Sequence, residues 1–269
     1  MSAEYLKVAR ALSEEAAGVV MDLLKSPISK NQKADHSWVT EADLKADRII
    51  RDGLEKAFPT HGVLTEESGM SGNQDSEWMW LVDPLDGTKA YTKGGPGFSV
   101  MVGLLNEGKP YLGVVVDPIL GLTYEAVRGE GAWLGSKRLH VSGRKDFSQM
   151  PLVHSSGFPQ EALKQIENQL HSPLCPPINS VGIKIGLVVR QEADIYISHH
   201  SVHYWDTCAP QVILEEAGGT LTRLDNQPLT YTMNGTYDHG TLILVTNGTR
   251  HKEVAKIVSQ VACAFPLTF

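Results

Sequence analysis

Apolar residues recur at helical spacing at the beginning of the chain. From Ser2 to Leu24 they fall three or four positions apart, and Pro27 ends the pattern. A second helical pattern runs from Leu44 to Phe58. Charged residues fill the positions between the apolar ones, so they are expected to face solvent. The pattern therefore predicts two amphipathic helices, each with one face on a core.

Strand patterns follow the second helix. Met79 to Val82 form an apolar run with the length and residue types of a buried strand, and Pro84 removes a backbone donor and should stop ladder pairing. Two more apolar runs flank Asn106-Glu107-Gly108-Lys109, which has the composition of a hairpin turn. Two helices against an antiparallel sheet would make this half α+β. The strands on either side of this turn are expected at residues 98–105 and 111–117. Another strand is expected at 122–127 and, after a turn, a last one within 129–133.

Strand and helix patterns alternate after the polar segment Ser142–Asp146. This segment is the expected boundary between an N-terminal half, residues 1–145, and a C-terminal half, residues 146–269. A helix over residues 210–217 should end at Gly218-Gly219, which is typical of a helix C-terminus. The alternation indicates that the second half is α/β. The other elements are expected as strands at 152–155, 193–197 and 242–245 and as helices at 160–170, 181–189 and 252–261.

The composition narrows the class of protein. The chain has 269 residues, of which 42% are hydrophobic and 20% charged, as is ordinary for a globular enzyme. Its net charge of −7 gives no support for a nucleic-acid groove.

The cysteines and the apolar runs indicate the cellular compartment in which the protein is expected. Cys175, Cys208 and Cys263 show no C-x-x-C spacing, so we expect reduced thiols and a cytoplasmic protein. No N-terminal segment has the pattern of a secretory signal, and no apolar run approaches the ~18 residues of a membrane span. Neither a membrane nor a nucleic acid is therefore an expected partner.

The stretch Asp83-Pro84-Leu85-Asp86-Gly87-Thr88 carries the main candidate chemistry. Two carboxylates three residues apart flank the Leu85 carbonyl, and such hard oxygen ligands suit Mg²⁺ better than zinc. Gly87 and Thr88 would open a helix whose free N–H groups face an anion. A polar turn in which an Asp caps the helix is the alternative that the stretch alone leaves open.

This stretch resembles the signature of the inositol monophosphatase superfamily of Mg²⁺-dependent, often lithium-sensitive phosphatases. Its continuation, Lys89-Ala90-Tyr91-Thr92, is most similar to the 3'(2'),5'-bisphosphate nucleotidase branch. Three more stretches of the chain occur in the same order as in the family, two before this stretch and one after it. The resemblance therefore covers most of the chain, from roughly Trp38 to Thr246. It implies a layered αβαβα sandwich with phosphatase activity.

One of these stretches is Val39-Thr40-Glu41-Ala42-Asp43. On local grounds it indicates a helix start, with the Thr40 hydroxyl as cap and Asp43 in the first turn. The resemblance implies instead that Asp43 hydrogen-bonds the active Thr88 and orients it, a role that metal sites commonly require.

Two acids elsewhere complete the expected ligand set. Thr65-Glu66-Glu67-Ser68 has the composition of an exposed acidic loop, but the resemblance implies that Glu66 both ligates metal and activates water. Asp206, in Tyr204-Trp205-Asp206-Thr207-Cys208-Ala209-Pro210, has the local pattern of a helix cap. The resemblance makes it a metal ligand from the second half, which places the active site where the halves meet. Glu67 is left without a role.

The substrate side is expected in Ser180-Val181-Gly182-Ile183-Lys184. This stretch resembles the nucleotide-side stretch of the bisphosphate branch. The resemblance implies that Ser180, Gly182 and Lys184 bind substrate, with Lys184 placed to meet a second phosphate as a point charge. The alternative is a lysine that extends along its helix to reach solvent.

Two departures weaken the nucleotide assignment. Residues 153–158 lack the S-R-S-H run often seen in this branch, and Ser198-His199-His200-Ser201 replaces a stretch that carries an Arg in some members. His199, His200 and His203 are expected to be solvated loop residues rather than zinc ligands.

The assembled set predicts a Mg²⁺-dependent phosphomonoesterase. Two ions at a spacing of about 3.5–4 Å would clamp the attacking and leaving oxygens of a phosphoryl transfer. Glu66 and Thr88 would position and deprotonate the attacking water, and the N–H groups of Gly87 and Thr88 would hold phosphate oxygens. The expected ligands of two or three Mg²⁺ ions are Glu66, Asp83, Asp86, Asp206 and the Leu85 carbonyl.

The expected substrate is small and phosphorylated. By resemblance it is 3'-phosphoadenosine 5'-phosphate, hydrolysed at the 3'-phosphate to AMP and phosphate. Inositol phosphates and fructose 1,6-bisphosphate are the alternative substrates. A different class of protein, an inactive regulator that binds metal or nucleotide, also stays open. The sequence is compatible with a monomer and with a homodimer.

Overall fold

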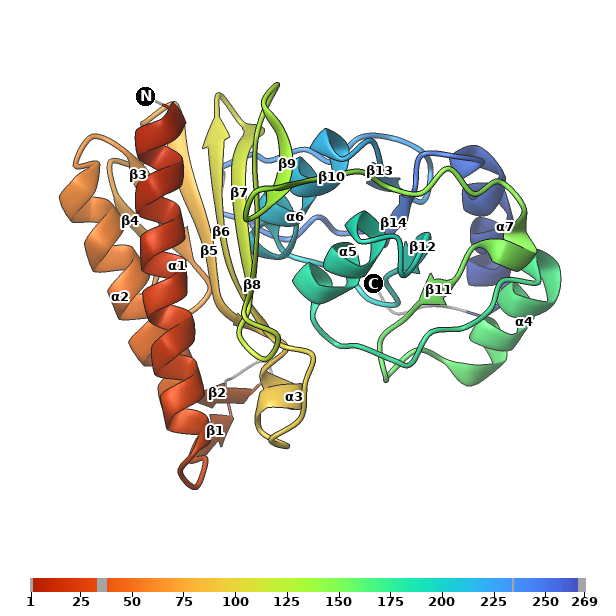
Figure 1. The fold of residues 1–269 in the computed structure, drawn as a ribbon, viewed down its shortest axis with the longest axis horizontal. Helices are drawn as coiled ribbons and strands as arrows, with labels where there is room; N and C mark the ends of the chain where they lie inside the picture. The colour runs from red at the N-terminus through yellow and green to blue at the C-terminus, as the bar shows by residue number, and fades with distance from the viewer. Residues whose placement is uncertain (1, 33–37, 234, 266–269) are drawn as a thin grey trace.

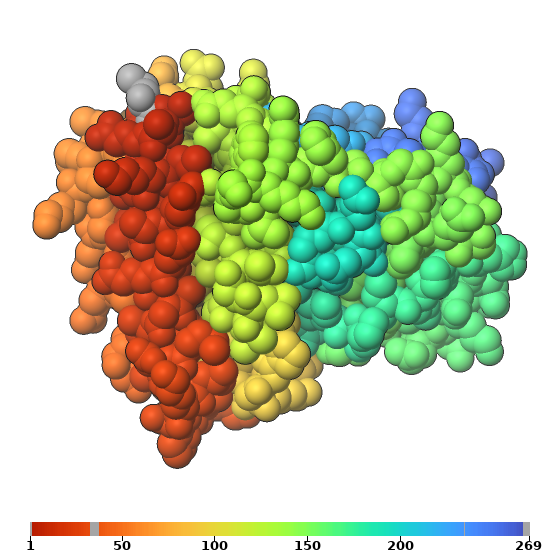
Figure 2. Space-filling view, in the orientation of Figure 1, coloured from red at the N-terminus to blue at the C-terminus, as the bar shows by residue number. Residues whose placement is uncertain are grey.

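The computed structural model describes residues 2–32, 38–233 and 235–265. These residues fold into five layers in the order helices, sheet, helices, sheet, helices (Figure 1). The αβαβα sandwich implied by the resemblance is therefore confirmed. In a space-filling view the layers follow one another without a gap, from the N-terminal helices to the second half of the chain (Figure 2).

Helices α1 (Ser2–Leu24) and α2 (Glu41–Ala57) form the first layer. Both lie close to their predicted positions, because the apolar residues that define the periodicity are the ones that become buried. Ala9, Val20 and Ile50 have no exposed surface and pack against the outer face of the large sheet. A short antiparallel ribbon precedes α2 and consists of β1 (Lys30–Gln32) and β2 (Trp38–Thr40).

The second layer is an eight-stranded sheet with the order β10-β9-β8-β7-β6-β5-β3-β4. Neighbouring strands are antiparallel except β3 and β5, which are parallel. The predicted hairpin turn is confirmed between β6 and β7, where Glu107 and Gly108 have the positive φ angles that such a two-residue turn needs. The strands are β3 (Gly62–Thr65), β4 (Gly69–Gly72), β5 (Trp78–Asp86), β6 (Ser99–Asn106), β7 (Lys109–Asp117), β8 (Leu122–Val127), β9 (Gly131–Leu134) and β10 (Lys137–Leu139).

Helices α5 (Val181–Val189) and α6 (Tyr204–Glu216) lie between the large sheet and a smaller one (Figure 1). α6 contacts the sheet at Gly103 and Gly113, which face each other on β6 and β7. A Cβ at Gly113 would lie 2.3 Å from the Ala209 carbonyl oxygen, and one at Gly103 would lie 2.8 Å from the Ala209 nitrogen. The missing side chains of this pair therefore let the helix lie with its backbone directly on the strands.

The fourth and fifth layers complete the C-terminal half. The small sheet has the order β11-β12-β14-β13, and α4 (Gln160–Leu170) and α7 (His251–Ala264) cover its outer face. One buried cluster runs from Leu64 to Val245, so the two halves share a core around α5 and α6. The division after residue 145 stays a prediction. The remaining elements are α3 (Thr88–Tyr91), a 3-10 turn (Phe147–Gln149), β11 (Leu152–Val153), β12 (Ile195–Ile197), β13 (Thr220–Arg223) and β14 (Ile243–Thr246).

Two expectations about local structure are wrong, and several short strands were not expected. Pro84 does not end β5, because pairing with β6 resumes at Asp86 beyond a bulge. α6 begins at Tyr204, well before Pro210, which lies inside the helix. The short strands β3, β4, β10 and β13 were absent from the expected elements, since each is too short for a periodic pattern. No helix in the described part of the chain is long and apolar enough to span a bilayer.

Gly113→Ala tests the contact between α6 and the sheet. The added methyl group would overlap the backbone of Ala209, which cannot move without its helix, so we expect the free energy of unfolding to fall by about 1–3 kcal/mol. Urea denaturation measures this change. The control is Gly18→Ala, because a Cβ at Gly18 meets no atom within 4 Å. Alanine in this exposed helical position should stabilise the fold by up to about 1 kcal/mol. Unchanged stability of Gly113→Ala would contradict the close contact.

Candidate active site

Two acids follow the ends of a parallel strand pair. β3 and β5 pair in register up to Thr65 and Val82. The Glu66 N–H then donates to the Val82 carbonyl at 3.1 Å. Because parallel strands end at the same edge of a sheet, Glu66 and Asp83 emerge side by side. The one parallel pair in this sheet thus brings together acids that are distant in sequence.

A β-bulge sets the direction of Asp83 and Asp86. Asp83 faces Met101 and Asp86 faces Ser99, so three steps along β5 match two along β6. In a regular strand, residues three apart point to opposite faces; the extra residue of the bulge returns both carboxylates to one side. Pro84 lies within the bulge, where its missing N–H costs no ladder hydrogen bond.

The N-terminus of α5 holds Asp86. Its Oδ2 accepts hydrogen bonds from Ser180 Oγ at 2.6 Å, from the Gly182 N–H at 3.0 Å and from Ser99 Oγ at 3.3 Å. A Cβ at Gly182 would lie 2.6 Å from Ser99 Oγ, so a glycine is needed for this close approach. Ser180 and Gly182, which the resemblance places on the substrate, contact a carboxylate of the acidic cluster in this structure.

Asp206 reaches the same place from α6. Its Oδ2 accepts the N–H of His203 at 2.7 Å, so Asp206 caps α6 from the third position of the helix and does not precede the helix as expected from the sequence. Asp206 also joins Asp83 and Asp86, since one oxygen of each carboxylate lies within 4.8 Å of the other two. Within the described residues, Asp83 is hydrogen-bonded through Oδ1 and the other two acids through Oδ2. The second oxygen of each carboxylate is therefore left to ligate a cation.

The acidic cluster, Asp83, Asp86 and Asp206, is unfavourable without positive charge. Burial, followed by the nearby Glu66 and cluster carboxylates, holds the pKa of Asp83 well above its usual range. Burial and Asp206 raise the pKa of Asp86 to about 6, although the hydrogen bonds from α5 oppose this shift. A raised carboxyl pKa means that ionisation costs more free energy here than in water.

The donor chemistry of the acidic cluster fits Mg²⁺. Buried carboxylates are hard oxygen donors, and the Leu85 carbonyl adds a further one beside them. Within the described residues, the cluster contains neither a thiolate nor an imidazole. A divalent ion would replace the protons that the raised pKa values favour, because ligation requires deprotonated carboxylates. The number of ions and the ligand role of Glu66 stay predictions.

Thr88 lies beside the acidic cluster and is held from α2. Its hydroxyl oxygen lies 3.1 Å from Asp43 Oδ1 and 3.1 Å from the Leu85 carbonyl oxygen. Asp43 Oδ2 accepts the Thr40 N–H at 2.7 Å and the Thr40 hydroxyl at 2.5 Å. Asp43 therefore caps α2 and contacts Thr88 at once. Gly87 has a φ of 94°, which favours glycine and turns the chain into α3.

A second acid on α2, Asp47, was not expected from the sequence to take part in the site. Asp47 lies one helical turn after Asp43, is buried and accepts a hydrogen bond from the Ser68 hydroxyl. This contact fastens the loop that carries Glu66. One face of α2 thus holds both Thr88 and the Glu66 loop. The signal that would have revealed Asp47 is its spacing of four residues from Asp43 on a predicted helix.

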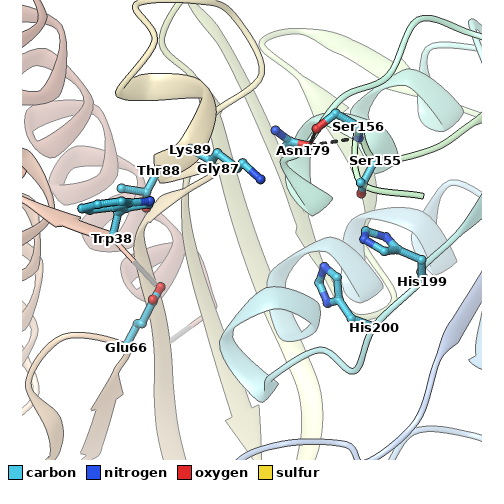
Figure 3. A pocket seen from close by; sticks show the side chains of 11 residues that line it. Trp38, Glu66, Gly87, Thr88, Lys89, Ser155, Ser156, Asn179, His199 and His200 are labelled. Carbon is cyan, nitrogen blue, oxygen red and sulfur yellow. Dashed lines mark hydrogen bonds between the residues drawn. The ribbon is translucent and has the colours of Figure 1, made fainter. Parts of the chain in front are cut away.

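A cavity of about 420 Å³ opens beside Glu66 and Thr88 (Figure 3). This volume falls within the range of small-molecule sites. The first half contributes Glu66, Thr88 and Lys89 to its wall, and the second half contributes His199 and His200. The cavity therefore lies between the halves, where the resemblance places the active site.

Lys184 lies beneath the wall of the cavity. Its side chain is 1% exposed, and Nζ donates to Ser155 Oγ at 2.7 Å and to the Asn179 carbonyl at 3.2 Å. Burial lowers the pKa of Lys184 to about 8, and the charges of the acidic cluster oppose the shift. Its contact with a second phosphate stays a prediction. In the described conformation Lys184 reaches the cavity only through Ser155 and Asn179, which line it.

The chain matches known proteins over most of its length. The model of the inositol monophosphatase family matches residues 1–262. The 3'(2'),5'-bisphosphate nucleotidase CysQ of Escherichia coli K12 is 34% identical over 226 residues, which cover 82% of this chain and 91% of CysQ. The Nus factor SuhB of Pasteurella multocida is 34% identical over 193 residues, which cover 70% and 72%. The structure of 2'AMP-bound SaIMPase-II has a TM-score of 0.80 at 26% identity and covers 99% of this chain and 98% of its own.

The raised pKa of Asp86 predicts how metal-free stability depends on pH. Its folded pKa of about 6 exceeds the unfolded value near 4, so between these values the folded state binds more protons. The carboxyl group therefore contributes stability as pH falls through this window and loses it as pH rises. In EDTA, Asp86→Asn should become more stable relative to wild type as pH rises from about 4 to about 7.

Thermal unfolding across this pH range measures the difference. Titrating groups distant from Asp86 contribute equally to both proteins and cancel. The raised pKa of Asp83, to which the Asp86 charge contributes, changes stability in the same direction. Asp75→Asn is the matched control, because Asp75 is exposed and should show no such trend. A difference between Asp86→Asn and wild type that stays constant with pH would contradict the raised pKa.

Proposed function

The chain belongs to the inositol monophosphatase family and is a phosphatase of that type, and from this premise we propose a Mg²⁺-dependent 3'(2'),5'-bisphosphate nucleotidase. The proposed reaction removes the 3'-phosphate of 3'-phosphoadenosine 5'-phosphate and releases AMP and phosphate. The observation that carries the proposal is the convergence of three carboxylates from both halves beside Thr88 and a cavity of substrate size.

The hydrogen bonds of Thr88 determine how it would treat a water molecule. Its hydroxyl has one proton, and both described neighbours of the oxygen, Asp43 Oδ1 and the Leu85 carbonyl, can only accept it. The proton is therefore committed to one of them, and the oxygen is left to accept a hydrogen bond from water. A water so held presents its own oxygen to the phosphorus. Asp43 thus acts through Thr88 as a positioning residue.

Glu66 would take the second proton of this water. It lines the cavity together with Thr88, and Figure 3 shows its carboxylate directed into the cavity. A water that donates to both Thr88 and Glu66 would be oriented and partly deprotonated for attack. No side chain has to bond to phosphorus, so we expect no phosphoenzyme.

The remaining residues would hold charge and phosphate. When bound by Glu66, Asp83, Asp86, Asp206 and the Leu85 carbonyl, two or three Mg²⁺ ions supply positive charge for the phosphate and leaving-group oxygens. Gly87 and Thr88, at the wall of the cavity, would direct their N–H groups to phosphate oxygens. By family resemblance, Li⁺ is expected to inhibit by occupying one of the cation positions.

Two similarities support a nucleotide substrate. The relative CysQ is named a 3'(2'),5'-bisphosphate nucleotidase, and the structural relative SaIMPase-II is described with 2'AMP bound. The Lys89 continuation of the central motif agrees with this branch. Inositol 1-phosphate is the second candidate, because a structure of SaIMPase-II is also described with inositol monophosphate bound. Fructose 1,6-bisphosphate is the third.

Phosphate release from these three substrates tests the proposal. We expect the highest kcat/KM for 3'-phosphoadenosine 5'-phosphate in Mg²⁺ and no turnover in EDTA, because the acidic cluster cannot act without a cation. A higher kcat/KM for inositol 1-phosphate would contradict the nucleotidase assignment alone. No release from any of the three in Mg²⁺ would favour the inactive regulator.

Thr88→Ala tests the proposed orientation of water. Removal of the hydroxyl should lower kcat by about 10²-fold, at the lower end of general acid–base effects. The Mg²⁺ concentration at half-maximal rate should change little, since Thr88 is not an expected ligand. Thr88→Ser keeps the hydroxyl and should recover most of the rate. Full recovery of Thr88→Ala at high Mg²⁺ would show that Thr88 acts on metal binding instead.

A further inference from the structure

His199 and His200 line the cavity but have no part in the proposed chemistry. They lie between β12 and α6, on the side of the cavity opposite Thr88 (Figure 3). Lys89 points into the cavity from the Thr88 side, so its ammonium and the two imidazoles face a common space. Residues of this kind on a cavity wall bind anions or donate hydrogen bonds to a ligand.

Each ring has a nitrogen atom for which the described residues provide no hydrogen-bond partner, and the one on His200 is left for a ligand. His200 Nδ1 lies 2.7 Å from the Ser201 carbonyl oxygen, which can only accept, so Nδ1 carries the proton and Nε2 is left over. His199 Nδ1 is buried and has no hydrogen-bond partner among the described residues. A Cβ at Gly157 would lie 3.1 Å from His199 Nε2, so the missing side chain makes room for this ring at the cavity wall.

Two lysine charges act on His199, from Lys89 on α3 and Lys184 on α5, and the imidazoles of His154 after β11 and His200 on the same loop would add to them when protonated. Burial, followed by these groups, lowers the pKa of His199 to about 4. The acids of the site lie elsewhere, with Glu66 on the first-half side of the cavity (Figure 3). One end of the cavity therefore suits cations, and the other end has a surplus of positive charge that an anion would relieve.

The rim between the two ends supplies a neutral donor. Asn179 Oδ1 accepts hydrogen bonds from the Ser156 N–H at 3.1 Å and from Ser156 Oγ at 2.8 Å. This arrangement fixes the amide so that its NH₂ group is left to donate into the cavity that Asn179 lines.

We propose that Lys89, His199 and His200 form a second anion subsite, which binds a phosphate group of the substrate other than the one that is hydrolysed. The inference rests on the proposed function and narrows its substrates to organic bisphosphates. It assigns the remote phosphate to cavity-lining groups, whereas the ammonium of Lys184 is buried and already hydrogen-bonded. An inositol monophosphate would leave the subsite empty.

Binding at this subsite should depend on pH. An anion favours the protonated imidazoles, so it raises their pKa and binding takes up protons. Affinity for the remote phosphate should therefore increase as pH falls toward about 6, because a bound phosphate opposes the burial and the nearby positive charges that lower the pKa of His199 to about 4. Proton uptake is measurable from the heat of binding in two buffers with different ionisation enthalpies.

The kinetic test compares two nucleotides that share the scissile group. In the double variant His199→Gln, His200→Gln, kcat/KM for 3'-phosphoadenosine 5'-phosphate should fall about tenfold or more, the scale of lost charge-assisted hydrogen bonds. The value for adenosine 3'-phosphate should change less than about twofold, because the acidic cluster and Thr88 are intact. His140→Gln replaces an exposed histidine outside the cavity and is the control. Equal losses on both substrates, or no loss on either, would overturn the subsite.

A binding test keeps the inference independent of turnover. Adenosine 5'-phosphate carries only the remote phosphate, and in EDTA the acidic cluster holds no cation that would attract this phosphate to the catalytic end. By calorimetry at about pH 6, wild type should bind adenosine 5'-phosphate about tenfold more tightly than adenosine, and the double variant should not. His200→Lys should keep this preference and weaken its dependence on pH. Equal binding of the two ligands by wild type would refute the subsite even if phosphatase activity is confirmed. A positive result would stand even if neither nucleotide is hydrolysed.

Discussion

Mutual repulsion among two buried carboxylates and a third that is partly exposed is the constraint on which the site depends. Asp83 and Asp86 come from one strand, and Asp206 comes from a helix of the other half, yet their oxygens lie within 4.8 Å of one another. Each is fixed by hydrogen bonds to protein, so the acids cannot move apart to relieve the repulsion. The buried ammonium of Lys184 compensates part of this charge, because it acts on Asp86. The remaining negative charge must be compensated by protons or by a cation. This explains why a phosphatase site can be built from side chains that carry the same negative charge as its substrate.

The fold supplies this arrangement through two close backbone contacts. The paired glycines Gly103 and Gly113 let α6 lie on the large sheet, which brings Asp206 near the end of β5. Gly182 lets the N-terminus of α5 approach Asp86. On the opposite face, α2 holds Thr88 through Asp43 and the Glu66 loop through Asp47. The groups expected to orient the water are thus held by the first helical layer. Asp206, the acid from the second half, is held by the helical layer between the two sheets.

Periodicity alone was enough to predict the long helices and the hairpin strands, since burial in the structure follows the same pattern. It was not enough at the site. Pro84 was expected to end a strand, but a bulge accommodates it and directs Asp83 and Asp86 to one side. Pro210 was taken as the start of α6, whereas the cap formed by Asp206 begins the helix at Tyr204. The burial of Lys184 and the position of Lys89 and His199 on the wall of one cavity depend on how distant segments pack, which no local pattern contains.

The central claim is that a divalent cation holds the two halves of the site together. The most direct measurement is the unfolding midpoint of the wild-type protein in EDTA and in increasing MgCl₂ at constant ionic strength. The account predicts that the midpoint rises with Mg²⁺, because a ligand at 100 times its Kd adds about 2.7 kcal/mol to the stability of the folded state. The rise should be much smaller in Asp206→Asn, which removes the ligand from the second half. A wild-type midpoint that does not change with Mg²⁺ would contradict the account.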